Sequence, residues 1–380
     1  MNLIERMIKI ELPLAEKEIK NEKKSNSTDL SCVSTSSVSQ KDLIVFNEKS
    51  KYDISIDEYM GNEKPPEDDI IILIQDGGLG DSVVFTVCLE LLRKKYSDRK
   101  LIFASFYPDI FYNNPNIDYL YCTRDYGDLY EKWVKKLRFN SSIIKKDLYN
   151  SGIHKLFPGK LSEAFCYIYN VPYYDDNIKV YITEDEDKEA KKFLKSFPKD
   201  VILIHPCGAM MNYNPTVKLT SNKDWFDVYW KKLVSLLNKD FYVVQLGGPL
   251  EKEIEGVETY LMGKTSIRQT MALVKNALTY VSIDSFIGHV GPSVGKSGVV
   301  LFGRSNVYIF GHNLNINVWV DNSCELNDLF CGRPQSYFGD AELYNGKSRS
   351  WECKNRSCMR AITPDLVYKK IFEAIERNTR

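Results

Sequence analysis

The chain has 380 residues, of which 43% are hydrophobic and 27% charged, which is the balance of a soluble globular protein with room for two domains. Lys and Arg together number 51, as do Asp and Glu, so a net charge of zero gives no argument for a nucleic-acid partner. No apolar run approaches the ~18 residues of a spanning helix, and residues 1–21 lack the uninterrupted apolar core of a secretion signal, so a cytoplasmic protein is expected.

The first 68 residues are predicted to be an extension that carries no chemistry. Residues 1–23 have helical spacing of apolar positions, residues 24–41 are rich in Ser and Thr like a linker, and residues 42–68 are polar and irregular. The alternative for residues 1–68 is an arm that docks a partner or forms an oligomer.

A first α/β unit is predicted over residues 69–195. The continuous apolar run Ile70–Ile74 is typical of a strand that is covered on both faces. After it, strands and helices alternate as in a doubly wound layer. The expected elements are a helix at Val83–Tyr96, strands at Leu101–Ala104 and Asp118–Cys122, helices near 127–147 and 160–170, an extended piece at Ile178–Ile182 and a helical connector at Glu184–Ser196.

A glycine-rich loop, Gln-Asp-Gly-Gly-Leu-Gly-Asp at residues 75–81, joins the first strand to the first helix. Gly78 and Gly80 let backbone approach a ligand closely, and a helix start offers unpaired N–H groups to an anion. Asp81 conflicts with a phosphate in this loop because both are negative. A dinucleotide-binding loop would need glycine where Val83 stands, so an NAD(P)-dependent oxidoreductase is the weaker alternative.

The pattern restarts in a second α/β unit over residues 196–315. Two such units predict two facing Rossmann-like domains, with a cleft beyond the carboxyl ends of their strands. The expected elements are strands at Val201–Ile204, Phe241–Leu246, Leu278–Ile283 and Gly298–Phe302, and helices at Asp224–Leu237, Ser266–Lys275 and Phe286–Val294.

The segment Asp284-Ser285-Phe286-Ile287-Gly288-His289 follows a predicted strand of the second unit. A helix that starts there would offer the N–H groups of residues 285–287 and the Ser285 hydroxyl to a diphosphate. Taken singly, Asp284 is equally well explained as a helix cap and His289 as a packing histidine. Together at a strand end they favour a diphosphate cradle.

Two further segments are candidates for nucleotide binding. In Thr220-Ser221-Asn222-Lys223-Asp224, the lysine lies at an expected helix start, where the helix dipole disfavours a cation unless an anion binds there. Glu251 follows two glycines at a strand end and could accept hydrogen bonds from ribose hydroxyls. The ordinary explanations are a surface lysine and a plain turn.

Five loose motifs follow one another in one order: Gly80-Asp81, His205-Pro206, Lys223-Asp224-Trp225, Asp284 to His289, and Gly295 to Gly303. In this order and spacing, the chain resembles the heptosyltransferases of glycosyltransferase family 9 over roughly residues 69–310. The resemblance implies the GT-B fold, in which the N-terminal domain binds the acceptor and the C-terminal domain binds the nucleotide sugar.

The resemblance also implies the reaction, an inverting and metal-independent transfer of a sugar, most simply heptose from ADP-heptose. The acceptor would be a hydroxyl of lipopolysaccharide core, another surface glycan or a protein, and the enzyme would be cytoplasmic or peripheral at the inner membrane. The family usually has glycine where Phe286 stands, and this departure favours the remaining alternative, a non-catalytic GT-B scaffold. The matched roles are Asp81 as general base, Lys223 at the diphosphate, Thr220, Ser221, Asp284, Ser285, Phe286 and His289 around the phosphates, Glu251 at the ribose, and Gly78 and Gly80 in the acceptor loop.

Acidic runs give no support for a catalytic metal. Asp185-Glu186-Asp187 has the spelling of a metal-binding Asp-x-Asp pair, but it opens the connector between the two units. We interpret it, like Asp175-Asp176, as solvated charge.

Four cysteines, Cys324, Cys331, Cys353 and Cys358, predict a structural zinc or iron site in a finger over residues 316–361. Free buried thiols are the alternative. The finger is partly similar to the iron-binding cysteine finger of autotransporter heptosyltransferases. A last helix is expected at Ile362–Ile375 within residues 362–380, with Thr363 as its N-cap.

Overall fold

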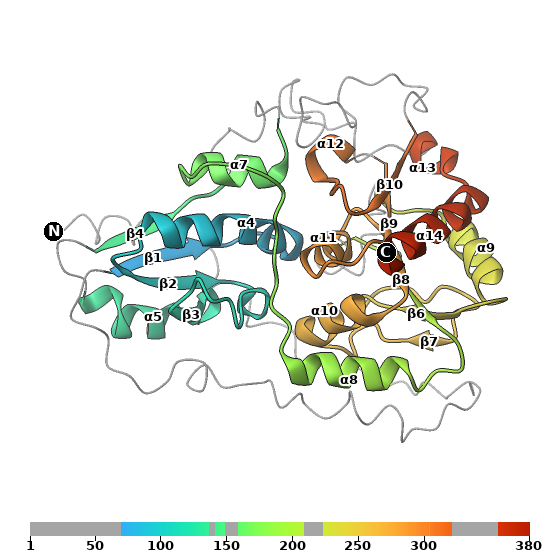
Figure 1. The fold of residues 1–380 in the computed structure, drawn as a ribbon, viewed down its shortest axis with the longest axis horizontal. Helices are drawn as coiled ribbons and strands as arrows, with labels where there is room; N and C mark the ends of the chain where they lie inside the picture. The colour runs from blue at the N-terminus through green and yellow to red at the C-terminus, as the bar shows by residue number, and fades with distance from the viewer. Residues whose placement is uncertain (1–69, 137–140, 149–158, 209–222, 304, 321–355) are drawn as a thin grey trace, which may run out of the picture. The chain divides into compact units, whose positions relative to one another are not determined.

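The computed structural model describes residues 70–136, 141–148, 159–208, 223–303, 305–320 and 356–380 (Figure 1). All of them lie in one compact unit, residues 46–380. The predicted extension over residues 1–68 lies outside the described residues, as do Thr220, Ser221, Cys324, Cys331 and Cys353.

The first sheet has four parallel strands in the order β3-β2-β1-β4. Its central strand β1 is buried along its whole length, as the continuous apolar run predicts, and Ile71 pairs with Leu101 in the neighbouring strand. The strands are β1 (Ile70–Gln75), β2 (Lys100–Ser105), β3 (Tyr119–Cys122) and β4 (Ser142–Lys145).

The second sheet has six parallel strands in the order β10-β9-β8-β5-β6-β7. The strand order reverses between β5 and β8, and in open α/β sheets ligands bind beyond the carboxyl ends of the strands at such a point. The strands are β5 (Val201–His205), β6 (Tyr242–Gln245), β7 (Thr259–Tyr260), β8 (Thr279–Ile283), β9 (Val299–Phe302) and β10 (Ile316–Trp319).

Helices cover both sheets, and none of those described is long and apolar enough to cross a membrane. The α-helices are α4 (Leu79–Lys95), α5 (Tyr126–Lys132), α7 (Leu161–Ile168), α8 (Glu184–Leu194), α9 (Asp227–Leu237), α10 (Ile267–Asn276), α11 (Phe286–Ser293), α12 (Val307–Phe310), α13 (Ser357–Ala361) and α14 (Pro364–Thr379). Short 3-10 helices are η1 (Pro108–Ile110), η2 (Thr123–Asp125) and η3 (Val134–Lys136).

The predicted helix near 127–147 is wrong. The α-helix α5 ends at Lys132, and Ser142–Lys145 instead forms β4, which pairs in parallel with β1. Two adjacent isoleucines, Ile143 and Ile144, favour a strand, and β1 offers them an open edge. The expected extended piece Ile178–Ile182 forms none of the described strands.

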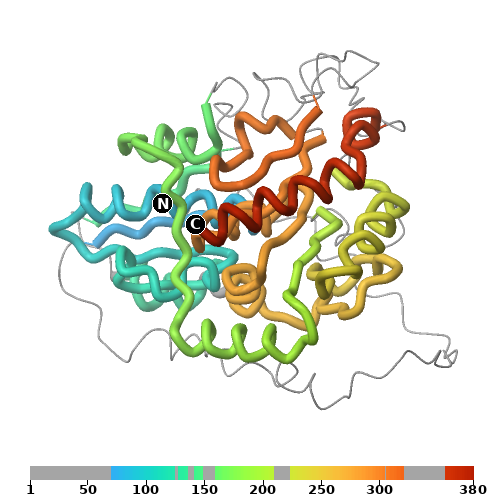
Figure 2. Tube along the Cα trace, turned by 45° about the vertical axis from the view of Figure 1, so that its right-hand side comes forward, coloured from blue at the N-terminus to red at the C-terminus, as the bar shows by residue number. Residues whose placement is uncertain are grey.

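The last helix begins as predicted, since the Thr363 hydroxyl accepts a hydrogen bond from the Leu366 amide at 3.3 Å. Its apolar face, with Val367, Ile371 and Ala374, packs on α9 and on strands of the second sheet. Figure 2 follows this helix as the red tube that ends near the middle of the unit.

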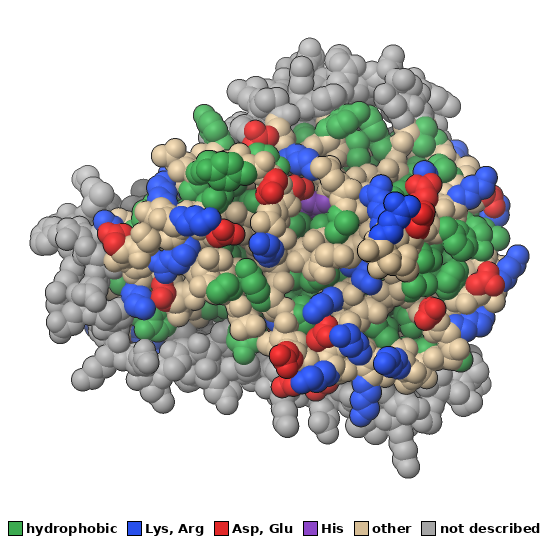
Figure 3. Space-filling model, viewed as in Figure 1, with side chains coloured by type: hydrophobic (Ala, Val, Ile, Leu, Met, Phe, Trp, Pro, Cys, Tyr) green, Lys and Arg blue, Asp and Glu red, His purple; other side chains and the backbone are tan. Residues whose placement is uncertain are grey.

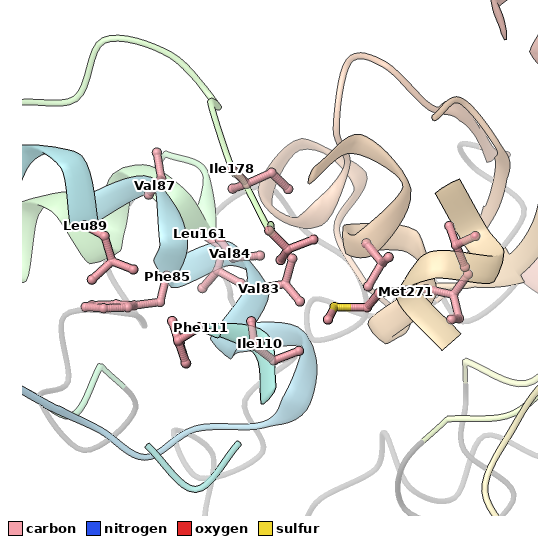
Figure 4. Packing of buried hydrophobic residues seen from close by; sticks show 14 of the residues in the cluster. Val83, Val84, Phe85, Val87, Leu89, Ile110, Phe111, Leu161, Ile178 and Met271 are labelled. Atoms are coloured by element: carbon pink, nitrogen blue, oxygen red, sulfur yellow. The ribbon is translucent and has the colours of Figure 1, made fainter. Parts of the chain in front are cut away.

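One continuous hydrophobic cluster joins the two sheets. Helix α4 supplies Val83, Val84 and Phe85, and helix α10 supplies Met271 from the second half. Figure 4 shows Val83 facing Met271, with Ile178 beside them. Ile178 belongs to residues 169–183 between α7 and α8, which we call the connecting segment. The start of α4 is therefore held against the second half of the chain.

Candidate functional site

The predicted nucleotide-binding residues of the second sheet meet beyond the carboxyl ends of β5, β6 and β8. The Nδ1 atom of His205, at the end of β5, lies 2.9 Å from the Ser285 hydroxyl oxygen, directly after β8. The His205 Nε2 atom lies 3.8 Å from Oε1 of Glu251, which follows β6. The sheet order, in which β5 lies between β8 and β6, brings these three residues together.

Lys223 forms an ion pair with Asp284, with 2.7 Å between Nζ and Oδ2. The lysine lies before α9, which begins at Asp227 rather than at Asp224 as expected. Burial alone would raise the pKa of the Asp284 carboxyl, but the Lys223 ammonium and the His289 ring hold that pKa below its ordinary value. The sequence predicted a bound phosphate as the partner of this lysine, whereas the structure pairs it with a carboxylate.

Ser285 is the N-cap residue of α11, and its hydroxyl makes no capping hydrogen bond to that helix. The first turn of α11 therefore keeps N–H groups that suit an anion. The side chain of Phe286 packs against the hydrophobic cluster that joins the sheets. Its bulk is thus accommodated in the core, and its backbone N–H remains part of the first turn.

Glu251 is buried, with a side-chain exposure of 5%. Its Oε1 accepts a hydrogen bond from the Gly248 amide at 2.7 Å, and its Oε2 is buried without an N–H or O–H donor among the described residues. A Cβ atom on Gly247 would lie 2.3 Å from that Oε2, so glycine is required for the close approach. Burial raises the pKa of Glu251 to about 7 and lowers the pKa of His205 to about 4.

Asp81 lies in the first turn of α4, and its carboxylate accepts a hydrogen bond from the Gly78 amide at 3.0 Å. A Cβ atom on Gly78 would lie 3.0 Å from the same carboxylate, and one on Gly77 would lie 3.2 Å from the Asp81 Cβ. These glycines make room for the Asp81 side chain. At Gly80, a Cβ atom would lie 2.9 Å from Cδ2 of His289, so the loop touches the motif after β8.

His289 is linked to two residues that no motif singled out. Its Nδ1 lies 2.8 Å from Nε2 of His312, and Nδ1 of His312 lies 2.7 Å from Oδ2 of Asp176. The prediction that Asp176 is solvated charge is wrong, because its side chain is only 14% exposed. Burial would raise its pKa, but the His312 hydrogen bond and the nearby Lys160 ammonium hold that pKa well below its ordinary value.

The prediction that Glu186 is solvated charge is also wrong, since its side chain is only 3% exposed. Arg268 of α10 donates to both of its carboxylate oxygens and, in addition, to the backbone carbonyls of Tyr181 and Asp109. A carboxylate held in this way is not available to a metal. Arg268 of α10, in the second half of the chain, therefore binds both the connector helix α8 and η1 of the first half.

The predicted four-cysteine site is untested. Cys358, in α13, is half-buried, and the other three cysteines lie outside the described residues. Within the part of the chain that the structure describes, no group of three or more His, Cys, Asp or Glu residues is arranged to hold a metal ion.

The face drawn in Figure 3 mixes acidic and basic side chains and exposes little histidine surface. This agrees with the small exposed fractions of His289 and His312, 6% and 5%. These rings belong to the interior of the candidate site.

The family model "Glycosyltransferase family 9 (heptosyltransferase)" matches residues 160–327, the segment that carries Lys223, Glu251 and the motif after β8. The chain is similar to the heptosyltransferases. It is 24% identical over 196 residues to the lipopolysaccharide core heptosyltransferase OpsX of Haemophilus influenzae, a match of 49% of this chain and 53% of OpsX. The chain thus spans about half the length of the curated relatives it matches.

Solved structures are similar in fold. The iron-containing dodecameric glycosyltransferase TibC from enterotoxigenic E. coli has a TM-score of 0.56 at 14% identity, over 83% of this chain and 80% of TibC. The E. coli ADP-heptose lps heptosyltransferase II has a TM-score of 0.53 at 12% identity, and the match covers 82% of this chain and 100% of that chain. These likenesses confirm the predicted α/β class with parallel sheets and heptosyltransferases as structural neighbours.

Proposed function

We propose that the chain is a glycosyltransferase that moves a sugar from a nucleoside-diphosphate donor to a hydroxyl group, with inversion and without a catalytic metal. One observation carries the proposal. The acceptor loop at the start of α4 touches His289 of the motif after β8, and Asp284 of the same motif is paired with Lys223. A candidate base and a candidate diphosphate site are therefore adjacent.

The donor half of the site would lie on the second sheet. The first-turn N–H groups of α11 and the Lys223 ammonium would hold the diphosphate, and Lys223 would neutralise the charge that develops on the leaving group. Asp284 would keep the ammonium oriented before the donor binds. Glu251 would accept hydrogen bonds from the ribose hydroxyls at its buried Oε2.

The acceptor half would lie on the first sheet. Asp81 would take the proton of the acceptor hydroxyl as its oxygen attacks the anomeric carbon, and the bond to the diphosphate would break on the opposite side of that carbon. In support, its carboxylate accepts a hydrogen bond from the Gly78 amide, which orients the side chain at the start of α4.

The comparisons favour ADP-heptose as donor, since one similar structure is named as a complex with ADP-D-beta-D-heptose. They favour lipopolysaccharide core as acceptor over another surface glycan or a protein hydroxyl, since OpsX is a lipopolysaccharide core enzyme by name. We propose that this reaction takes place in the cytoplasm, either in solution or at the inner membrane, and that the acceptor and donor domains span residues 69–195 and 196–315. For residues 1–68 the proposal remains an extension without chemistry, with an arm that forms an oligomer as the alternative.

We further propose that Cys324, Cys331, Cys353 and Cys358 hold a structural zinc or iron ion. Thiolates are the ligands that these metals prefer in four-cysteine sites. The iron-containing relative TibC favours iron.

The test is to incubate the pure protein with ADP-heptose, other ADP-sugars and UDP-sugars, and to follow donor hydrolysis and transfer by mass spectrometry. In parallel, the melting temperature of the protein is measured with ADP, ADP-heptose, UDP-sugars and NAD. Stabilisation and hydrolysis with ADP-heptose are expected. Stabilisation by NAD alone would point to an oxidoreductase, and no response to any nucleotide would point to a scaffold.

A further inference from the structure

Three buried side chains form an unbroken hydrogen-bonded line into the candidate site. Asp176 Oδ2 lies 2.7 Å from His312 Nδ1, and His312 Nε2 lies 2.8 Å from His289 Nδ1. Asp176 comes from the segment between α7 and α8, whereas His312 follows α12 and His289 belongs to α11. The line therefore runs from the connecting segment to the donor motif.

With one proton on each ring, the line determines where the protons lie. An ionised Asp176 is only an acceptor, and its Lys160 neighbour at 3.1 Å keeps it ionised, so His312 Nδ1 must donate. With a single proton on His312, its Nε2 is an acceptor, which requires a proton on His289 Nδ1. In a neutral His289, Nε2 is consequently an acceptor.

That acceptor atom lies at the junction of the two proposed half-sites. His289 Nε2 is 4.0 Å from Oδ1 of Asp284, beyond hydrogen-bond distance, and a Cβ atom on Gly80 would lie 3.4 Å from it. With the other tautomer, an N–H group would occupy this junction beside the Lys223 ammonium.

We propose that Asp176 and His312 are positioning residues that hold His289 with its proton on Nδ1, so that Nε2 accepts a hydrogen bond from a sugar hydroxyl beside Gly80. The role of Nε2 rests on the proposed glycosyltransferase function, whereas the tautomer does not. The arrangement has the logic of a carboxylate that fixes the tautomer of a catalytic imidazole, here extended by one ring.

The tautomer is measured on the full ligand-free chain labelled with ¹⁵N-histidine, in which only four histidines need assignment. Nitrogen chemical shifts should show His289 protonated on Nδ1 and bare on Nε2. Asp176→Asn, whose amide can donate to His312 Nδ1, and His312→Phe, which removes the acceptor, should each shift the His289 nitrogens. A matched control is Tyr280→Phe, which removes a buried hydrogen bond to Asn315 but leaves the line intact. A proton on Nε2 in the wild type, or nitrogens that stay unchanged in both variants, overturns the proposal.

Turnover provides the second readout. In Asp176→Asn and His312→Phe, kcat should fall by about a hundredfold while the Kd for ADP changes by no more than about twofold. Tyr280→Phe should keep both constants. If the wild type transfers sugar and the two variants match its kcat, the positioning role is wrong and the proposed function stands. If the tautomer is as expected and no sugar is transferred, the proposed function fails and the assigned tautomer stands.

Discussion

Buried charge in the candidate site is compensated residue by residue. Asp284, with 4% of its surface exposed, has the Lys223 ammonium at 2.7 Å, and this pairing offsets the cost of removing the carboxylate from water. Glu251 has no such cation among the described residues, and burial raises its pKa although the hydrogen bonds from Gly248 and Cys207 act in the opposite direction. These two carboxylates, which follow strands on either side of β5, therefore have pKa values shifted in opposite directions because of their partners.

Replacing Asp81 by Asn tests the proposed base. The amide oxygen can still accept the hydrogen bond from Gly78, so the start of α4 should be preserved while the base is lost. We expect kcat to fall by ~10²–10⁴-fold with the Kd for ADP nearly unchanged. Steady-state kinetics and calorimetry measure the two. Glu90→Gln, an exposed change on the same helix, is the control, and full activity of Asp81→Asn would show that another group is the base.

Replacing Glu251 by Gln tests its raised pKa. The pKa of this carboxyl is raised from 4.5 to about 7 in the folded chain, so the stability contribution of the protonated form is complete below pH ~4.5 and is lost as pH rises through ~7. The loss amounts to at most about 3 kcal/mol. The variant lacks this titration, so it should unfold in urea at a similar midpoint near pH 5 and at a higher midpoint near pH 8. Midpoints that differ equally at both pH values would contradict the assignment.

At the level of elements, Arg268 joins three segments that are separate in the sequence. Its guanidinium, on α10, binds Glu186 of α8, the Tyr181 carbonyl of the connecting segment and the Asp109 carbonyl of η1. It also lies 5.2 Å from the centre of the Tyr112 ring. The contact between the two halves thus combines this ion pair with the apolar packing of Val83 and Met271.

Replacing Arg268 by Met should destabilise the chain strongly. The change leaves Glu186 buried and without its cation, which typically costs about 3–5 kcal/mol. The double variant with Glu186→Gln should recover part of the loss, because no uncompensated charge remains. Urea unfolding gives the free energy of unfolding of the wild type, of Arg268→Met and of the double variant. Glu184→Ala on the same helix breaks an exposed pair with Lys188 and should cost less than about 1 kcal/mol; an equal effect of both changes would argue against the buried clamp.

At the level of the whole molecule, the sequence proposes a metal finger that the described residues cannot test. Metal analysis of the purified chain should find about one zinc or iron per chain if four thiolates form one site. Cys353→Ser should lose the metal and lower the melting temperature, whereas Cys122→Ser, a buried cysteine of the first sheet, should keep the metal. A metal-free wild-type chain would favour free thiols.

The class of the fold and most of its elements could be read from local pattern. Continuous apolar runs predicted the buried parallel strands β1 and β5, and Thr363 predicted the start of α14. The failure at β4 is instructive, because a short apolar piece is helix or strand according to the edge that it finds.

The residues of the candidate site also divide into those that local sequence identifies and those that only the folded chain brings together. Local sequence identified Asp81, Lys223, Glu251 and the motif after β8, because glycines and strand ends leave a pattern within a few residues. Only the folded chain could pair Lys223 with Asp284 over 61 positions, Glu186 with Arg268 over 82, and Asp176 with His312 over 136. Strand order and the path of the connecting segment determine these pairs, and neither can be recognised from the residues that flank each partner. For this reason the buried carboxylates Asp176 and Glu186 resemble ordinary surface charge in the sequence.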